Sequence, residues 1–337
     1  MVKVNIISGF LGAGKTTLIK KLLTGSVAKE KIILLENEYG EVGVDGSFMK
    51  DSGIIVDELN SGCICCTLVG DFQKAVDDLI AKYHPDRLLI EPSGVGKLSE
   101  ILAAVERAKE RHSDLVVTGC ATVVDAGKCR MYMKNFGEFF LDQIKTSATV
   151  IFSRTQLLSA ERIEKSRALV EEQHPGVRIV TTPWDDLSAD TLLEVIESGK
   201  PMEIHLDDDD DDDDEDEHEH HHHHHDHDDH DEHCCCGHHH HHHDHDADEV
   251  FTSWGVETAK KFSKADIEHA LTELDTGNYG MILRSKGIVD GGADGWLEFD
   301  YVPGEWEVRA RGADVGGKLV VIGSKLDEKA IAALFGC

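Results

Sequence analysis

The stretch from Val2 to Leu23, VKVNIISGFLGAGKTTLIKKLL, holds the motif that decides the fold. A short apolar run, Val2–Ser8, leads into GFLGAGKT, and a helical pattern follows from Thr17 to Leu23. The middle segment matches G-x-x-x-x-G-K-[ST] and stands between a strand and a helix, where that motif must stand. It therefore predicts a loop whose backbone N–H groups bind nucleotide phosphates. The expected binding residues are Gly9, Gly12, Ala13, Gly14, Lys15, Thr16 and Thr17.

Two motif side chains have separate expected roles. Lys15 should reach the β- and γ-phosphate oxygens as a catalytic group, and the Thr16 hydroxyl should bind Mg²⁺. Further along the chain, LLIEPSG ends an apolar run at Glu91. We expect Glu91 to serve the magnesium side of the site, and the Gly94 N–H to approach a γ-phosphate.

Strand-like and helical segments alternate up to about residue 204. The strand-like runs are Val2–Ser8, Lys31–Glu36, Arg87–Glu91, Leu115–Val124, Thr149–Phe152 and Val177–Thr181, and amphipathic segments include Phe72–Lys82, Ser99–Arg111 and Ala160–Gln173. Such alternation predicts an α/β fold in which helices cover both faces of a parallel sheet.

Three cysteines lie within four residues at Cys63, Cys65 and Cys66. Thiolates bind soft and borderline metal ions such as Zn²⁺, and three of them leave one position for a further ligand. The motif favours an exchangeable metal site, with redox chemistry and plain core packing as the alternatives. The isolated Cys120, Cys129 and Cys337 lack partner spacing, so we expect them to be simply buried or exposed.

An acidic segment, ENEYGEVGVD, follows the second strand-like run and offers further ligands. Glu36 and Glu41 are candidates for the metal, with a solvated acidic loop as the alternative. Glu41 and Asp45 are also candidates for orienting the catalytic water. No spacing assigns that role, so we expect slow intrinsic hydrolysis that a partner or metal stimulates.

Residues 207–249 contain 21 Asp/Glu, no Lys or Arg, and 17 of the 22 His of the chain. Charge repulsion and the lack of apolar side chains predict a disordered linker. Its imidazoles and carboxylates favour metal collection, against a passive spacer. Beyond it, strand-like runs and the helical patterns Lys264–Leu274 and Asp327–Phe335 predict a small α+β domain.

The formal net charge of −31 disfavours nucleic acid as a partner, because acidic surfaces repel phosphate backbones. No run of about 18 apolar residues is present, which argues against a membrane protein. The first residues lack a cleavage-site pattern, so we expect a cytoplasmic location.

These motifs together resemble the CobW-like P-loop GTPases, which are related to HypB and UreG. Gly9–Thr17 matches the nucleotide loop, Glu36–Asp45 the switch-like loop, Gly62–Cys66 the C-x-C-C motif and Glu91–Gly94 the E-x-x-G element; segments after Phe251 match the family's carboxyl-terminal domain. The resemblance implies a GTPase domain at 1–204, a His/Asp-rich linker at 205–249 and a CobW-like domain at 250–337.

The resemblance also implies a function. The expected protein is a GTP- and Mg²⁺-dependent metallochaperone that delivers Zn²⁺, with Ni²⁺ or Co²⁺ as alternatives, to a metal-requiring client protein. A nucleotide-dependent homodimer is the expected assembly. Two other functions fit the residues less well: a metal buffer whose nucleotide site only stabilises the fold, and a small-molecule kinase.

One departure concerns the base. Where the family carries N-K-x-D, this chain reads Ser153-Arg154-Thr155-Gln156. An Asp accepts two hydrogen bonds from guanine, whereas Gln156 offers one acceptor and one donor. Arg154 retains the ability to stack on the base. We therefore expect weakened guanine preference, with ATP as an alternative substrate.

Overall fold

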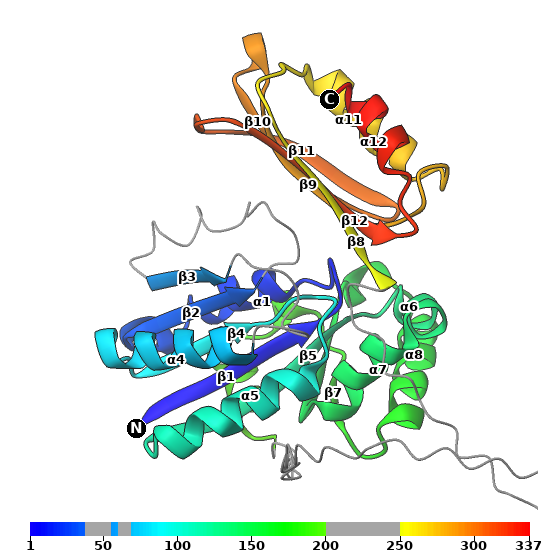
Figure 1. Cartoon of the computed structure of the whole chain (residues 1–337). Coiled ribbons are helices and arrows are strands. Elements are labelled where there is room, and N and C mark those ends of the chain that lie inside the picture. The colour runs from blue at the N-terminus through cyan, green and yellow to red at the C-terminus, as the bar shows by residue number, and fades with distance from the viewer. Residues whose placement is uncertain (38–54, 60–68, 200–249) are drawn as a thin grey trace, which may run out of the picture. The chain divides into compact units, whose positions relative to one another are not determined.

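The computed structural model describes residues 1–37, 55–59, 69–199 and 250–337 of the chain (Figure 1). Predictions for Glu41, Asp45, Cys63, Cys65 and Cys66 lie outside the described residues, as do those for the insert at 207–249.

The first region is built on a seven-stranded parallel sheet. Its strands are β1 (Val2–Gly9), β2 (Ile32–Asn37), β3 (Ile55–Leu59), β4 (Arg87–Glu91), β5 (Leu115–Asp125), β6 (Thr149–Ser153) and β7 (Arg178–Val180). The order across the sheet is β3-β2-β4-β1-β5-β6-β7, and each neighbouring pair is parallel. All seven carboxyl ends therefore meet at one edge, where the phosphate loop follows β1.

Helices cover both faces of this sheet, as the alternation predicted. Helices α1 (Lys15–Leu22) and α9 (Ala189–Glu197) pack on one face, and α4 (Val69–Tyr83), α5 (Leu98–Arg111), α6 (Cys129–Asn135), α7 (Gly137–Thr146) and α8 (Ala160–Gln173) pack on the other. Strand β4 shows why: Leu88 and Ile90 join the core with α4 and α5, while Leu89 joins the core with α1 and α9. Successive strand side chains point to opposite faces, so apolar runs need cover on both.

The six strand predictions in this region are confirmed to within one or two residues, but β3 was not predicted. Its sequence, IVDEL, carries two acids, which interrupt the apolar pattern expected of a buried strand. Within the described residues, β3 pairs with β2 and forms the edge of the sheet. Because it runs parallel to β2, this edge strand returns the chain to the carboxyl edge of the sheet.

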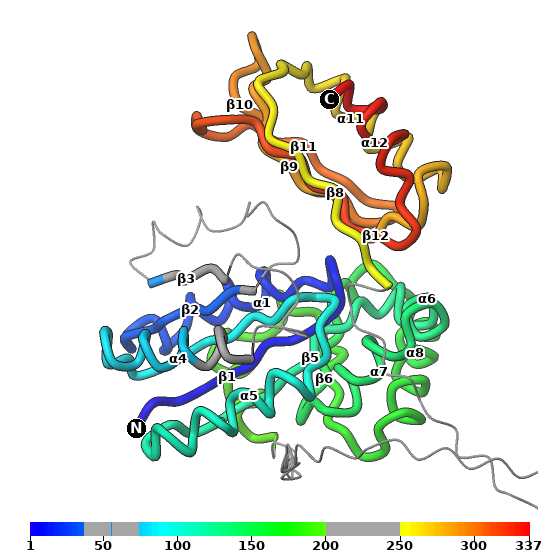
Figure 2. The backbone as a smooth tube through the Cα atoms, viewed as in Figure 1, coloured from blue at the N-terminus to red at the C-terminus, as the bar shows by residue number. Residues whose placement is uncertain are grey.

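The second region is the expected small α+β domain (Figure 2). A five-stranded antiparallel sheet, in the order β11-β10-β9-β12-β8, consists of β8 (Thr252–Thr258), β9 (Met281–Asp290), β10 (Trp296–Val302), β11 (Glu305–Arg311) and β12 (Gly317–Ser324). Helices α11 (Lys264–Leu274) and α12 (Glu328–Phe335) bury its apolar side chains, and Phe299 stacks on Phe335 with 6.4 Å between ring centroids. The Ser263–Asp266 capping box fixes where α11 begins.

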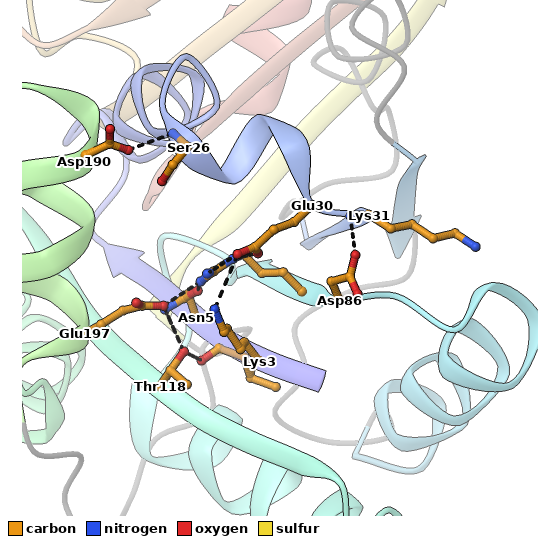
Figure 3. A network of polar contacts seen from close by, with 11 residues as sticks. Lys3, Asn5, Ser26, Glu30, Lys31, Asp86, Thr118, Asp190 and Glu197 are labelled. Atoms are coloured by element: carbon orange, nitrogen blue, oxygen red, sulfur yellow. Dashed lines mark hydrogen bonds and ion pairs between the residues drawn. The ribbon is translucent and has the colours of Figure 1, made fainter. Parts of the chain in front are cut away.

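A buried arginine bonds three residues at the opposite edge of the parallel sheet, Asn5, Glu30 and Glu197, whose positions Figure 3 shows. Arg87, the first residue of β4, is 1% exposed. Its Nε donates to Glu30 Oε2 (2.6 Å), its Nη1 donates to Glu197 Oε1 (2.6 Å), and it also bonds Asn5 of β1. Because Glu197 ends α9, a single guanidinium joins two central strands to the helix on their shared face.

Replacing this arginine is expected to destabilise the fold. Arg87→Met keeps much of the side-chain volume but removes the cation from Glu197 and leaves Glu30 with only the longer contact to Lys3 (3.4 Å), so we expect a loss of about 2–4 kcal/mol in unfolding free energy, measured by urea denaturation. Arg111→Met is the matched control, because Arg111 is 41% exposed and pairs with Asp77 at the surface; we expect a loss below about 1 kcal/mol. Equal losses would contradict a central role for Arg87.

The same contact predicts a pH dependence. The hydrogen bond from Arg87 is the main cause that holds the pKa of Glu30 below its ordinary value. A depressed carboxyl pKa stabilises the fold above that ordinary value and loses its effect as the pH falls through the folded-state pKa. Glu30→Gln should therefore destabilise the protein by about 1–2 kcal/mol near pH 7, and the deficit should shrink near pH 4. Glu161→Gln, at an exposed carboxylate, is the control. If the loss of unfolding free energy in Glu30→Gln were the same at pH 7 and pH 4, the Arg87 contact would not cause the pH dependence.

Candidate functional site

The phosphate loop has the backbone that its glycines permit. Gly9, Gly12 and Gly14 have φ values of 145°, 67° and 105°, which lie in the region that side chains other than glycine rarely adopt. A Cβ on Gly9 would also overlap the carbonyl oxygen of Val123. Ala13 is buried, and Thr17 is exposed on the first turn of α1. The loop therefore turns directly into α1, whose first backbone N–H groups are the expected phosphate donors.

The Lys15 side chain lies within the loop and is only 5% exposed. Its Nζ donates to the carbonyl oxygen of Gly9 (2.9 Å). A neutral carbonyl is a weaker partner for an ammonium group than a phosphate oxygen is. Lys15 is thus held close to its expected phosphate partners by a contact that phosphate can replace.

Thr16 and Glu91 meet although 75 positions separate them in sequence. The Thr16 hydroxyl donates to Glu91 Oε1 over 3.0 Å, joining the first turn of α1 to the end of β4. Hydroxyl and carboxylate oxygens are hard donors of the kind that Mg²⁺ prefers, and Mg²⁺ commonly takes its other ligands from phosphates and water. The donor chemistry of this pair fits magnesium, and its expected role toward that ion stays a prediction.

Glu36 lies on the neighbouring strand in the same row of the sheet. It is 4% exposed, and its Cα is in register with Glu91 of β4 on one side and Glu58 of β3 on the other. The sequence analysis offered Glu36 as a ligand for a transition metal. The structure brings it beside the acid expected on the magnesium side, and its ligand role remains a prediction.

Gly94, the last residue of EPSG, packs against the phosphate loop. A Cβ added to Gly94 would lie 2.8 Å from both the backbone N and Cδ2 of Leu11, so only glycine lets these two loops approach. The Gln143 side chain, fully buried on α7, fastens this turn by donating to the carbonyl oxygens of Gly94 (3.2 Å) and Gly96 (2.9 Å). Sequence reasoning missed Gln143; its signal was a polar residue on the apolar stripe of a helix.

The segment after β6 carries the expected base-binding residues. Arg154 has φ 59° and its Nη1 donates to Asp125 Oδ2 over 2.7 Å. Asp125 ends β5 and is 4% exposed, which makes this a largely buried anchor for the arginine. Gln156 is exposed within the short helix η2 (Thr155–Leu157). Asp125 was also missed, although it ends its strand as Glu91 ends β4.

Trp184 completes this side of the site from the loop after β7. Its Nε1 donates to the carbonyl oxygen of Phe152 (2.9 Å). A Cβ on Gly14 would lie 3.3 Å from Trp184 Cη2 and 3.8 Å from Ser153 Cβ, so the indole and Ser153 both border the phosphate loop. No local motif predicted a role for Trp184.

The three isolated cysteines, Cys120, Cys129 and Cys337, are buried or exposed as expected. Cys120 and Cys129 are buried, and burial raises the pKa of each thiol to about 12, while Cys337 is exposed. Among the described residues, no group of three or more His, Cys, Asp or Glu side chains is arranged to hold a metal ion. In the same part of the chain, no helix has both the length and the apolar character needed to cross a membrane.

Comparison with known families decides the relationship. The model of the CobW/HypB/UreG nucleotide-binding domain matches residues 3–181, and that of the cobalamin synthesis protein cobW C-terminal domain matches residues 251–337. The chain belongs to the CobW/HypB/UreG family. Its phosphate loop, Glu91 and Gly94 all fall within the family's nucleotide-binding domain.

Individual members of the family match this chain over only part of their length or at low sequence identity. The zinc chaperone YeiR of Escherichia coli (strain K12) is 36% identical over 162 residues, which cover 48% of this chain and 49% of YeiR. The zinc chaperone CobW of Sinorhizobium sp is 33% identical over 194 residues, covering 49% and 54% respectively. The chain thus spans about half the length of the curated relatives it matches. The crystal structure of Zn(II)-bound YjiA GTPase from E. coli matches with a TM-score of 0.44 and 21% identity over 99% of this chain and 98% of that one.

The packing of Gly94 yields a test of this family element. Gly94→Ala should displace the phosphate loop and weaken binding of a Mg²⁺–nucleotide at least about tenfold, or about 1.4 kcal/mol, measured by calorimetric titration. Gly96→Ala is the matched control, because its nearest neighbour would be Ser93 O at an ordinary 3.5 Å. An equal effect of the two substitutions would show that the approach of Gly94 to Leu11 does not shape the site.

Proposed function

We propose that the chain hydrolyses a nucleoside triphosphate and uses this step to bind and deliver a transition metal, most simply Zn²⁺, to a client protein. The family assignment supports nucleotide binding. The names of the matched relatives, zinc chaperones in both curated cases, support zinc as the metal that is carried.

The phosphate loop and Glu91 supply the hydrolytic half of the proposal. The α1 N-terminus and Lys15 bind phosphate oxygens, and Thr16 and Glu91 hold the magnesium side. Magnesium neutralises charge on the phosphates when bound. The backbone N–H of Gly94, which lies beside Leu11, donates a hydrogen bond to the terminal phosphate.

One observation carries the link between nucleotide and metal: β3 runs parallel to β2, so both strands end at the carboxyl edge. Cys63 follows Leu59, the last residue of β3, by four positions, and α4 begins at Val69, three positions after Cys66. Four residues reach at most about 14 Å. Because β3 stands two strands from β4, at about 10 Å, a connection of this length is long enough for the proposed cysteine site to lie near Glu36 and Glu91.

The short connection between β3 and the cysteine motif allows nucleotide hydrolysis to affect the proposed metal site. The γ-phosphate and its ion recruit groups from the edge that also carries Glu36, and loss of that phosphate removes those contacts. We therefore propose Cys63, Cys65 and Cys66 as thiolate ligands of the carried metal, with Glu36 and Glu41 as candidate carboxylate ligands. The proposed regions are a nucleotide domain at 1–204, a metal-collecting segment at 205–249 and a carboxyl-terminal domain at 250–337.

The composition of residues 207–249 supports a second candidate, a metal buffer. Seventeen histidines and 21 acids offer many ligands without any need for nucleotide. The two functions differ in one respect: a chaperone requires nucleotide to change metal affinity, and a buffer does not.

Co²⁺ titration of the full chain separates these candidates. Cobalt bound to thiolates shows a sulfur-to-metal charge-transfer band that imidazole and carboxylate sites lack. The insert also carries Cys234, Cys235 and Cys236, so the part of the band that Cys65→Ser removes reports the site at Cys63, Cys65 and Cys66. We expect the Mg²⁺ complex with a non-hydrolysable triphosphate analogue to bind Co²⁺ at this site at least about fivefold more tightly than the diphosphate complex does.

Three variants sharpen the result. Lys15→Ala should abolish the difference between nucleotides while preserving Co²⁺ affinity without nucleotide. Cys65→Ser should weaken or abolish the band, whereas Cys337→Ser, an exposed cysteine, should keep it. Equal Co²⁺ affinity in both nucleotide complexes of the unaltered chain would reject the chaperone and favour the buffer.

A further inference from the structure

We propose that the base site of this chain binds adenine and guanine nucleoside triphosphates with similar affinity, because it reads features common to both purines and lacks the paired acceptors that select guanine. The inference rests on the proposed nucleotide site and names its substrate class. Three groups carry it: the Asp125–Arg154 pair, the hydroxyls of Ser153 and Thr155, and the carboxamide of Gln156.

The Asp125–Arg154 pair fixes a planar cation beside the phosphate loop. Asp125 accepts from Arg154 Nη1 (2.7 Å) and from the backbone N–H of Gly127 (2.9 Å), so the carboxylate is itself held in place. Guanidinium planes stack on aromatic rings of any purine, since every base has a π face. This contact adds affinity without distinguishing adenine from guanine.

The hydroxyls of Ser153 and Thr155, beside Arg154, are suited to an acceptor that adenine and guanine have in common. Ser153 Oγ and Thr155 Oγ1 belong to side chains that are 4% and 2% exposed, and neither atom has a hydrogen-bond partner within the described residues. A buried hydroxyl without a partner costs about 1–3 kcal/mol, which a ligand acceptor offsets. The purine N7 is such an acceptor and is present in both adenine and guanine.

Gln156 is the position at which discrimination is lost. Guanine presents two donors at its N1–H and 2-amino group, and a carboxylate accepts both, whereas a carboxamide offers one acceptor and one donor. Turned one way, Gln156 Oε1 accepts from guanine N1–H; turned the other way, its Nε2 donates to adenine N1. Each base gains one hydrogen bond, and the guanine 2-amino group gains none.

The test compares three non-hydrolysable triphosphate analogues with the full chain and Mg²⁺ by calorimetry: guanosine, adenosine and inosine forms. Inosine lacks only the 2-amino group of guanosine. We expect the three dissociation constants to agree within about fivefold. Gln156→Asp should restore two acceptors and raise the guanosine preference over both other forms by about 10- to 100-fold.

Two controls separate base reading from general damage. Gln173→Asp makes the same chemical change at the far end of α8, about 20 Å along the helix, and should leave all three affinities unchanged. Arg154→Ala should weaken all three analogues by a similar factor, because stacking is common to them, and should leave their ratios unchanged.

Clear outcomes overturn the inference. A guanosine preference above about fivefold in the unaltered chain, or a Gln156→Asp variant with unchanged ratios, would reject it. Failure to bind any analogue would reject both this inference and the nucleotide site. Similar binding of all three analogues without an effect on Co²⁺ affinity would reject the chaperone proposal and leave this inference intact.

Discussion

The hydrogen bond between Thr16 and Glu91 is the contact on which the rest of the site depends. It joins the first turn of the helix after the phosphate loop to the end of a central strand, and it brings together two oxygen donors suited to magnesium. Around it, the glycine backbone exposes N–H groups, Lys15 lies against the Gly9 carbonyl, and Gly94 packs on Leu11. Each of these features contributes only because parallel strands end at the same edge of the sheet.

The same edge explains how the proposed nucleotide site can affect the proposed metal site. Glu36 is in register with Glu91, and the unpredicted strand β3 returns the chain to this edge shortly before the cysteine motif. In the proposed mechanism, this covalent connection limits the distance between the phosphate and the thiolates without requiring a long network of coupled side chains. At the opposite edge, the buried Arg87 links β4 to β1 and α9, the elements beneath the phosphate loop, through its hydrogen bonds to Asn5 and Glu197.

Local motifs predicted much of this arrangement from sequence. The spacing of Gly9, Gly14 and Lys15, and the position of Glu91 after an apolar run, are properties of neighbouring residues, and the structure brings Thr16 and Glu91 together as expected. Gln143, Asp125 and Trp184 were not predicted because their roles come from tertiary pairing with Gly94, Arg154 and Gly14, which no local pattern encodes. Strand β3 was missed because its acids interrupt the apolar signal, and its backbone pairing with β2 decides the outcome.

Hydrogen–deuterium exchange of the full chain measures whether the terminal phosphate orders the segment that links the nucleotide site to the cysteine motif. Peptides covering residues 38–68 and the phosphate loop would be followed in the Mg²⁺ complexes of a triphosphate analogue and of the diphosphate. The account predicts slower exchange across 38–68 in the triphosphate complex, because the terminal phosphate recruits groups from this edge. Protection of the phosphate loop in both complexes, with identical exchange across 38–68, would contradict it.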